Sequence, residues 1–251
     1  MPTWAQAWFW GLVAGAALVV GAGIAYLAPV PRRIIAGVMA FGGGVLISAL
    51  AFELMEDAYA RGGLTATAAG FLSGATIYTA ANWYLARLGA KHRKRSGSQQ
   101  PSEADQPGSG LALAIGALLD GVPESIVIGV SLIGGGVVSA VTVLAVFLSN
   151  VPEGLCSAAG MKQAGRSRRF IFGVWTGIAV ISSIAALFGY VMVGRFAPAW
   201  IAAITAFAAG AILAMLADTM IPEAYEEAHN FTGLITVIGF LSAFVLSRIL
   251  E

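Results

Sequence analysis

The chain has 251 residues, of which 58% are hydrophobic and 11% are charged, and its formal net charge is +1. A soluble domain usually has about 25% charged residues, so this composition excludes a chain whose whole surface faces water. The single cysteine excludes an internal disulfide, and the charge gives no support for nucleic acid as a partner. We therefore expect an all-α polytopic membrane protein, with one transmembrane domain over residues 1–251 and the lipid bilayer around it.

Apolar runs predict the membrane spans, since about 20 helical residues cross the hydrocarbon core. The predicted spans are residues 4–27, 34–55, 64–88, 111–133, 137–160, 170–194, 199–222 and 231–250. Gly134–Gly136 predicts a tight connection between the fourth and fifth spans. Residues 89–110 are rich in Ser, Gly, Pro and Gln, which predicts a flexible cytoplasmic loop between the third and fourth spans.

Basic residues are distributed unevenly among the predicted loops. If the N-terminus lies outside, only Arg61, Arg195 and Arg248 face outward, and the other eleven Lys and Arg residues face the cytoplasm. The positive-inside rule therefore predicts eight spans in the cell membrane, with both termini outside. The run Lys91–Arg95 is interpreted chiefly as an anchor of this topology, with a lipid-headgroup or regulatory role as the alternative.

Two distant segments resemble each other. Residues 40–59 and 206–225 align without gaps at 7 of 20 identical positions, and both end in Ala-Tyr. They belong to the second and seventh predicted spans, which run in opposite directions because an odd number of crossings separates them. Inverted repeats are typical of secondary transporters, so the alignment predicts an inverted repeat among the eight helices.

Polar segments interrupt the apolar runs of the fourth and fifth spans. Asp120 and Glu124 are four residues apart, as are Ser149 and Glu153, so each pair shares one helix face. Asn150 lies about one turn before Glu153. A charge inside the bilayer costs about 2.5–3.5 kcal/mol, so such residues indicate a functional site.

Each of these segments contains a proline directly before its glutamate, Pro123 in one and Pro152 in the other. A proline inside a helix removes a backbone hydrogen bond and kinks the chain, which leaves carbonyl oxygens able to face a cavity. Two kinked helices with adjacent carboxylates would form an oxygen-lined site, and a divalent cation would relieve the repulsion between them. A protonated glutamate that hydrogen-bonds a neighbouring helix is the alternative.

The seventh span has a third acidic segment. Asp218 and Glu223 belong to an Asp-x-x-x-Pro-Glu sequence, which is similar to the Asp-x-x-Pro-Glu sequence of the fourth span. Asp218 lies inside the apolar run, so we include it among the candidate metal ligands.

The segments Asp120–Ser125 and Ser149–Gly154 resemble the paired Pro-Glu motifs of the ZIP (Zrt/Irt-like) metal transporters. The resemblance extends along most of the chain, and the seventh predicted span looks like that of the family, close to its bacterial branch. It implies a two-metal site between the fourth and fifth spans, with Glu124 and Glu153 as the bridging carboxylates. It also implies that the metal moves into the cytoplasm.

The chain departs from the family pattern at two positions. Asp120 stands where the family usually has histidine, and Gly121 stands where it usually has asparagine. Imidazole suits zinc, copper, iron and nickel, whereas oxygen ligands suit harder ions. The resemblance therefore leaves open whether one or two metal positions remain.

We expect transport of a divalent cation, zinc or alternatively manganese or iron, without a tightly bound cofactor and without enzymatic activity. The candidate metal ligands are Asp120, Glu124, Ser149, Asn150, Glu153 and Asp218. A non-transporting metal sensor or membrane scaffold with the same fold is the alternative. An intramembrane hydrolase is a weaker one, because the sequence has no nucleophile elbow and no histidine-based pair. The sequence leaves a homodimer open.

Overall fold

The computed structural model describes residues 1–133 and 139–250, so the predicted glycine turn at 134–136 lies outside the described residues. Over these ranges the chain is helical and has no strand, in agreement with the predicted all-α class. The α-helices are α1 (Thr3–Leu27), α2 (Arg32–Ala49), α3 (Met55–Leu85), α4 (Ser109–Val130), α5 (Ala140–Gln163), α6 (Arg168–Val191), α7 (Pro198–Met215), α8 (Ile221–Ala228) and α9 (Thr232–Leu250). Short π- or 3-10-helical turns join some of them: η1 (Leu50–Leu54), η2 (Ala86–Ala90), η3 (Val193–Arg195), η4 (Leu216–Met220) and η5 (His229–Phe231).

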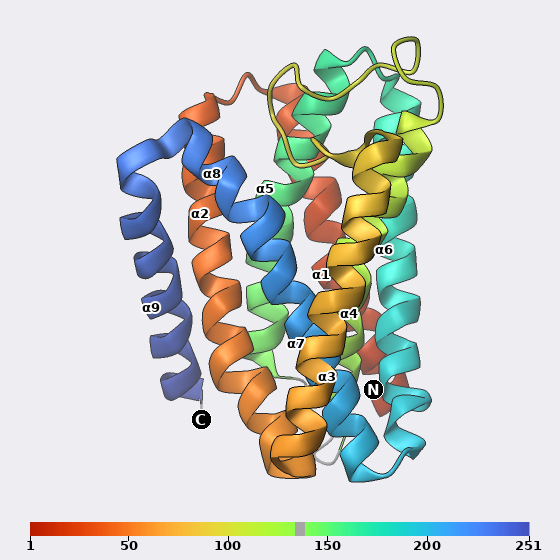
Figure 1. Cartoon of the computed structure of the whole chain (residues 1–251), viewed down its shortest axis with the longest axis vertical. Coiled ribbons are helices and arrows are strands. Elements are labelled where there is room, and N and C mark those ends of the chain that lie inside the picture. The colour runs from red at the N-terminus through yellow and green to blue at the C-terminus, as the bar shows by residue number, and fades with distance from the viewer. Residues whose placement is uncertain (134–138, 251) are drawn as a thin grey trace.

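Six helical runs within the described ranges are long and apolar enough to cross a membrane. Two of them, Arg32–Ala90 and Pro198–Ile249, contain 59 and 52 residues, well over twice the roughly 20 that a bilayer requires. Each contains a residue with non-helical backbone: Gly63, with φ 69° and ψ −177°, and His229, with φ 46° and ψ −120°. The chain reverses direction near both residues, so each long run consists of two oppositely directed helices (Figure 1).

Helices α2 and α9 pack with their backbones in close contact, through glycines on both sides. A Cβ atom on Gly44 would overlap the carbonyl of Thr236 in α9. A Cβ atom on Gly239 would overlap the carbonyl of Phe41 in α2. Small residues at such positions let membrane helices approach closely, where van der Waals contact stabilises their pairing.

The contact between α3 and α7 repeats this arrangement. A Cβ atom on Gly210 would overlap the carbonyl of Phe71, and one on Gly74 would overlap the carbonyl of Phe207. Gly210 and Phe207 are the aligned counterparts of the α2 residues that make the first contact. Equivalent positions of the two similar sequence segments therefore make equivalent helix contacts.

The π-helical turns at the ends of α2 and α7 fall at corresponding positions too. Turn η1 covers Leu50–Leu54 and turn η4 covers Leu216–Met220, and the ungapped alignment of 40–59 with 206–225 superimposes these two ranges. A π-helical turn inserts an extra residue into the helix and is frequent at functional sites. The resemblance between the two segments thus extends to an uncommon backbone feature.

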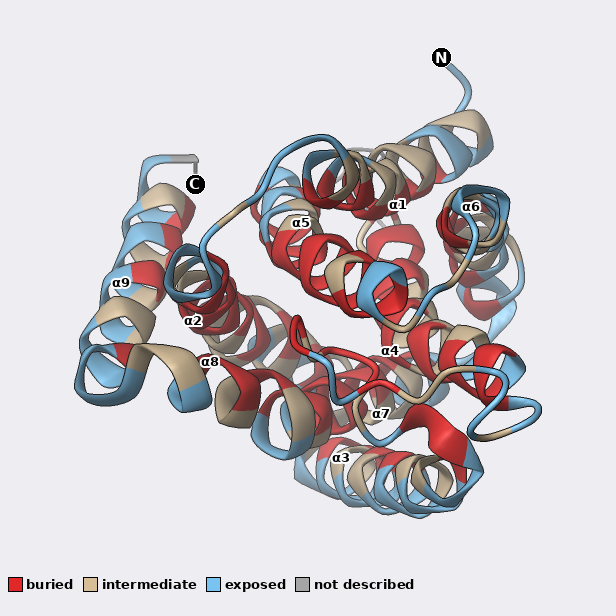
Figure 2. Ribbon diagram, turned by 90° about the horizontal axis from the view of Figure 1, so that it is seen from above, coloured by how far each residue is buried: buried red, intermediate tan, exposed pale blue. Residues whose placement is uncertain are grey.

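Both termini lie toward one end of the bundle, and the loop at 89–110 covers the other end (Figure 1). Figure 2, which is seen from the loop end, shows buried loop backbone among α3, α4, α5 and α8. The loop therefore enters the bundle as well as covering it.

Candidate cation site

The predicted ligands of the fourth and fifth spans are all buried in the bundle. Pro123 lies inside α4 and Pro152 inside α5, so both helices continue through their prolines. At most 4% of the surface is exposed for each of the five polar residues around them, which are Asp120, Glu124, Ser149, Asn150 and Glu153. Carboxylates at this depth need a counter-ion, a hydrogen-bond donor or a proton.

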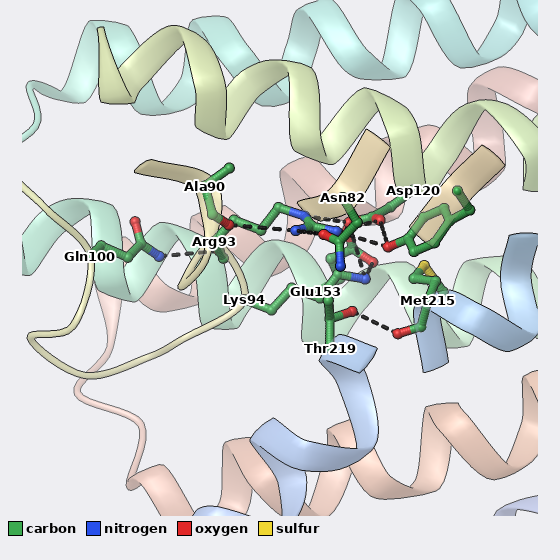
Figure 3. A network of polar contacts seen from close by, with 10 residues as sticks. Asn82, Ala90, Arg93, Lys94, Gln100, Asp120, Glu153, Met215 and Thr219 are labelled. Carbon is green, nitrogen blue, oxygen red and sulfur yellow. Dashed lines mark hydrogen bonds and ion pairs between the residues drawn. The ribbon is translucent and has the colours of Figure 1, made fainter. Parts of the chain in front are cut away.

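Asp120 has its charge matched by Arg93, which comes from the loop after η2. The Arg93 guanidinium donates from Nε to Oδ2 and from Nη2 to Oδ1, both at 2.9 Å. The hydroxyl of Tyr78 in α3 donates to Oδ1 at 2.6 Å. Arg93 also donates to the side-chain oxygen of Asn82 at 2.7 Å (Figure 3). This bidentate, charge-assisted pairing is the strongest form of hydrogen bonding between side chains.

Lys94, the next residue, joins the two helices. Its Nζ lies 2.8 Å from Oε2 of Glu153 in α5 and 3.3 Å from Oδ2 of Asp120 in α4. Lys94 and Arg93, whose side chains point among the carboxylates (Figure 3), are exposed by only 3% and 2%. The structure therefore brings Asp120 and Glu153 together, with a lysine ammonium between them.

The charges on these two basic residues follow from their surroundings. Burial alone would lower the pKa of Lys94, but the nearby carboxylates of Asp120 and Glu153 outweigh it, and the pKa lies above its ordinary value. Burial would also lower the pKa of Arg93, but the carboxylate of Asp120 outweighs it, so this pKa too lies above its ordinary value. Both side chains are therefore cations at neutral pH.

Glu124 differs from its neighbours. Both of its carboxyl oxygens are buried and have no hydrogen-bond partner among the described residues. Glu124 lies within electrostatic range of Glu153, Lys94 and Asp120. A buried polar group without a partner costs free energy. The unpaired Glu124 carboxyl is therefore a position where a proton or a cation could bind.

The remaining predicted ligands have other partners or positions. Ser149 donates to the carbonyl of Val146 in its own helix at 2.9 Å. The amide of Asn150 donates to the carbonyl of Ala14 at 2.9 Å and so ties α5 to α1. Asp218 lies in η4 and is exposed, so the structure does not bury it with the α4 and α5 carboxylates. Ser149 and Asn150 thus have structural hydrogen bonds beside the cluster.

The loop that carries Arg93 and Lys94 is fastened to the bundle. The side-chain amide of Gln100 lies 3.1 Å from the carbonyl oxygens of Arg93, Arg95 and Ser157. These contacts fold the chain from 93 to 100 back onto α5. The composition of 89–110 predicts a flexible loop, whereas this part of it is buried because its polar groups find partners on the helices.

Helix α8 provides a second attachment for the same loop. The backbone N–H of Ser96 donates to Oε1 of Glu223 at 3.1 Å, and Nε of Arg95 lies 2.9 Å from its Oε2. Arg95 also pairs with Glu226. The interpretation of the run Lys91–Arg95 as a topology anchor is therefore incomplete, because three of its cations pair with carboxylates of the bundle.

In residues 1–133 and 139–250, no three His, Cys, Asp or Glu side chains lie together in an arrangement that could hold a metal ion. Basic side chains stand among the carboxylates instead. Sequence reasoning missed Arg93, Lys94, Tyr78 and Asn82 as part of the site. A charge balance was the available signal, since buried acids in two spans require cations and Lys91–Arg95 is the densest basic run.

Comparison with known proteins adds no relative on which to rest an assignment. A scan against models of protein families finds no match for this chain, and a search of curated proteins finds none.

Proposed function

We propose that this chain carries a small divalent cation across a membrane and that Glu124 and Glu153 hold the cation between α4 and α5. The observation that carries the proposal is the buried carboxyl of Glu124, both of whose oxygens have no partner among the described residues. Glu153 lies near it and is paired with a single lysine. A cation between the two glutamates would satisfy both.

The helices around the two glutamates support a carrier. Ionisable groups inside membrane helices face the bundle interior or a water-filled path and commonly mark ion routes. Here they lie at two proline-containing helices, where freed carbonyl oxygens can add ligands. Since the nearby donors are oxygens, the site suits manganese at least as well as zinc or iron.

The proposed transport route requires eight crossings. If the helices on both sides of the reversals near Gly63 and His229 each cross the membrane, the two long helical runs contribute four crossings, and α1, α4, α5 and α6 contribute the other four. The matching glycine contacts and π-helical turns of 40–59 and 206–225 support an inverted repeat. Such repeats provide alternating access when one part of the bundle rocks against the other.

The resemblance to ZIP transporters agrees with this proposal and supplies its direction, from outside to the cytoplasm. On that orientation both termini lie outside and the loop at 89–110 lies inside. The basic residues around this loop favour the same orientation.

A non-transporting membrane scaffold is the second candidate, and a specific observation favours it. Arg93 and Lys94 already neutralise Asp120 and Glu153, so two of the three acids need no metal. On this alternative the buried ion pairs hold α3, α4 and α5 together and have no other task.

Cation uptake into liposomes separates the two candidates. Purified protein would be tested with Zn²⁺, Mn²⁺ and Fe²⁺, beside Glu124→Gln and Glu153→Gln, which keep the shape of the side chain and remove its charge. Asp105→Asn, in the exposed part of the loop, is the matched control. We expect uptake by wild type and control and a loss of about tenfold or more in each glutamine variant. If folded wild-type protein carries none of these ions, the scaffold is the candidate function that remains.

A further inference from the structure

We infer that Lys94 is a tethered competitor of the transported cation: its ammonium takes the cation's place and must leave before a cation binds, whereas Arg93 stays and restricts the site to one cation. This inference rests on the proposed carrier function and adds how the site is filled and regulated.

The position of the Lys94 ammonium supports its competition with the transported cation. Nζ of Lys94 contacts one carboxylate of α4 and one of α5, at 3.3 Å and 2.8 Å. A divalent cation held by Glu124 and Glu153 would need the Glu153 carboxylate that Lys94 now contacts. Because two cations at one buried carboxylate repel each other, Lys94 and the transported ion exclude each other.

Lys94 is held in a way that permits its departure. An ammonium is a compact charge on a flexible stem, and its contacts here are two carboxylate oxygens. Its backbone lies in a turn beyond η2, outside the helices, so its withdrawal requires the loop to move from residue 94 onward, with Arg93 still in place, and no helix to unfold. Local opening of this kind has a lower free energy than global unfolding.

Arg93 is held differently. Its guanidinium donates to both oxygens of Asp120, to Asn82, to the Tyr78 hydroxyl and to the carbonyl of Ala90. A planar guanidinium that is bonded on all sides is a structural pair, and its removal would leave Asp120 buried and uncompensated. Asp120 is thereby withdrawn from metal binding, so Glu124 and Glu153 remain for a single ion.

The consequence for affinity follows from competition. When only a fraction of molecules has Lys94 withdrawn, the apparent Kd rises by the inverse of that fraction. A side chain tethered by a short linker acts at an effective concentration of about millimolar, so it competes strongly with micromolar metal. Removing the ammonium should therefore tighten cation binding.

Equilibrium binding of Mn²⁺ and Zn²⁺ to the full chain in detergent micelles, measured by titration calorimetry, tests the inference. The variants are Lys94→Gln and, as the matched control, Lys91→Gln, which changes an exposed lysine of the same loop. We expect Lys94→Gln to lower the apparent Kd by about tenfold or more and Lys91→Gln to leave it within about twofold. A folded Lys94→Gln protein with unchanged or weaker affinity would overturn the inference.

Hydrogen exchange provides a second measurement. Saturating Mn²⁺ should speed amide exchange over residues 91–100 of wild-type protein, because the ion displaces Lys94. Exchange that stays unchanged or slows while Mn²⁺ is bound would contradict mutual exclusion. If wild type takes up an ion and Lys94→Gln binds it no more tightly, only the competitor fails. If neither protein binds or carries any of the ions, the carrier proposal fails and the competitor fails with it.

Discussion

The buried polar cluster has two halves with opposite properties. The arginine half consists of Asp120, Arg93, Tyr78 and Asn82, and in it every charge has its counter-charge and every bond is short. The glutamate half consists of Glu124, Glu153 and Lys94, and in it one carboxyl has no partner and the other has a lysine. Asp120 and Glu124 are one turn apart on α4, so the difference comes from the loop residues that meet them.

This difference separates structural from functional charge. A fully paired carboxylate gains little by binding a metal, because it must first lose the partners it has. An unpaired buried carboxyl can bind a cation without losing any partner. We therefore assign stability to the arginine half and cation binding to the glutamate half, and the following predictions test that assignment.

The largest effect should come from Arg93→Met. Removing the guanidinium leaves Asp120 as an uncompensated buried charge, which should lower the free energy of unfolding by about 3–5 kcal/mol. Thermal unfolding in detergent micelles would measure it. The double variant with Asp120→Asn should recover part of the loss, because no charge is then left unpaired. If Arg93→Met is as stable as wild type, the arginine half does not stabilise the fold.

Gln100→Ala should have a smaller effect. The change removes the side-chain amide contacts to three carbonyl oxygens, which should cost about 1–3 kcal/mol of local stability. Exchange of the amides at 93–100 should speed up, and Lys94 should be released more often. Gln99→Ala, an exposed neighbour, is the control. Equal exchange in the two variants would mean that Gln100 does not fasten the loop.

Glu124→Gln should change stability least among the buried acids. No hydrogen bond to a described residue is lost, so the free energy of unfolding should stay within about 1 kcal/mol of wild type. Cation uptake should nevertheless disappear, because the unpaired carboxyl is the proposed ligand. A strongly destabilised Glu124→Gln protein would show that Glu124 has a structural partner after all.

The weakest effect concerns the outer part of the loop. A hydrogen bond from Arg166, then those from the N–H groups of Gly108 and Gly110, lower the pKa of Glu103 to about 2. Since this carboxyl is more acidic in the folded state, its contribution to stability is present above its ordinary pKa and is lost as the pH falls toward 2.

A carboxyl-carbon NMR titration of Glu103 would check this value. A pKa for Glu103 near the ordinary glutamate value would show that the Arg166 contact does not hold in solution.

The sequence alone predicted much of the helical arrangement and the buried carboxylates. Apolar run length located the helices, and Val-Pro-Glu located Glu124 and Glu153 inside α4 and α5. The sequence could not show that Arg93 pairs with Asp120, because that contact joins a polar loop to a helix 27 residues away. Composition indicates a solvated loop, but it cannot tell which of the loop's charges find buried partners.

The same limit applies to the other predicted ligands. Ser149 and Asn150 have the right spacing to face a metal, yet Ser149 donates to a carbonyl of its own helix, and Asn150 donates to a carbonyl of α1, which only the packing of α5 against α1 shows. Asp218 lies in a predicted span, but the face of η4 that carries it is exposed. Spacing places a residue on a helix face, and tertiary packing decides what that face meets.

We propose that the glutamate half binds one cation in the place of the Lys94 ammonium. The most direct measurement is a crystal structure of Lys94→Gln soaked with Mn²⁺, with anomalous scattering recorded to locate the metal. We predict one anomalous peak between the carboxylates of Glu124 and Glu153, with Arg93 still bonded to Asp120. A peak at Asp120 with Arg93 displaced, or no peak between the glutamates in well-ordered crystals, would contradict it.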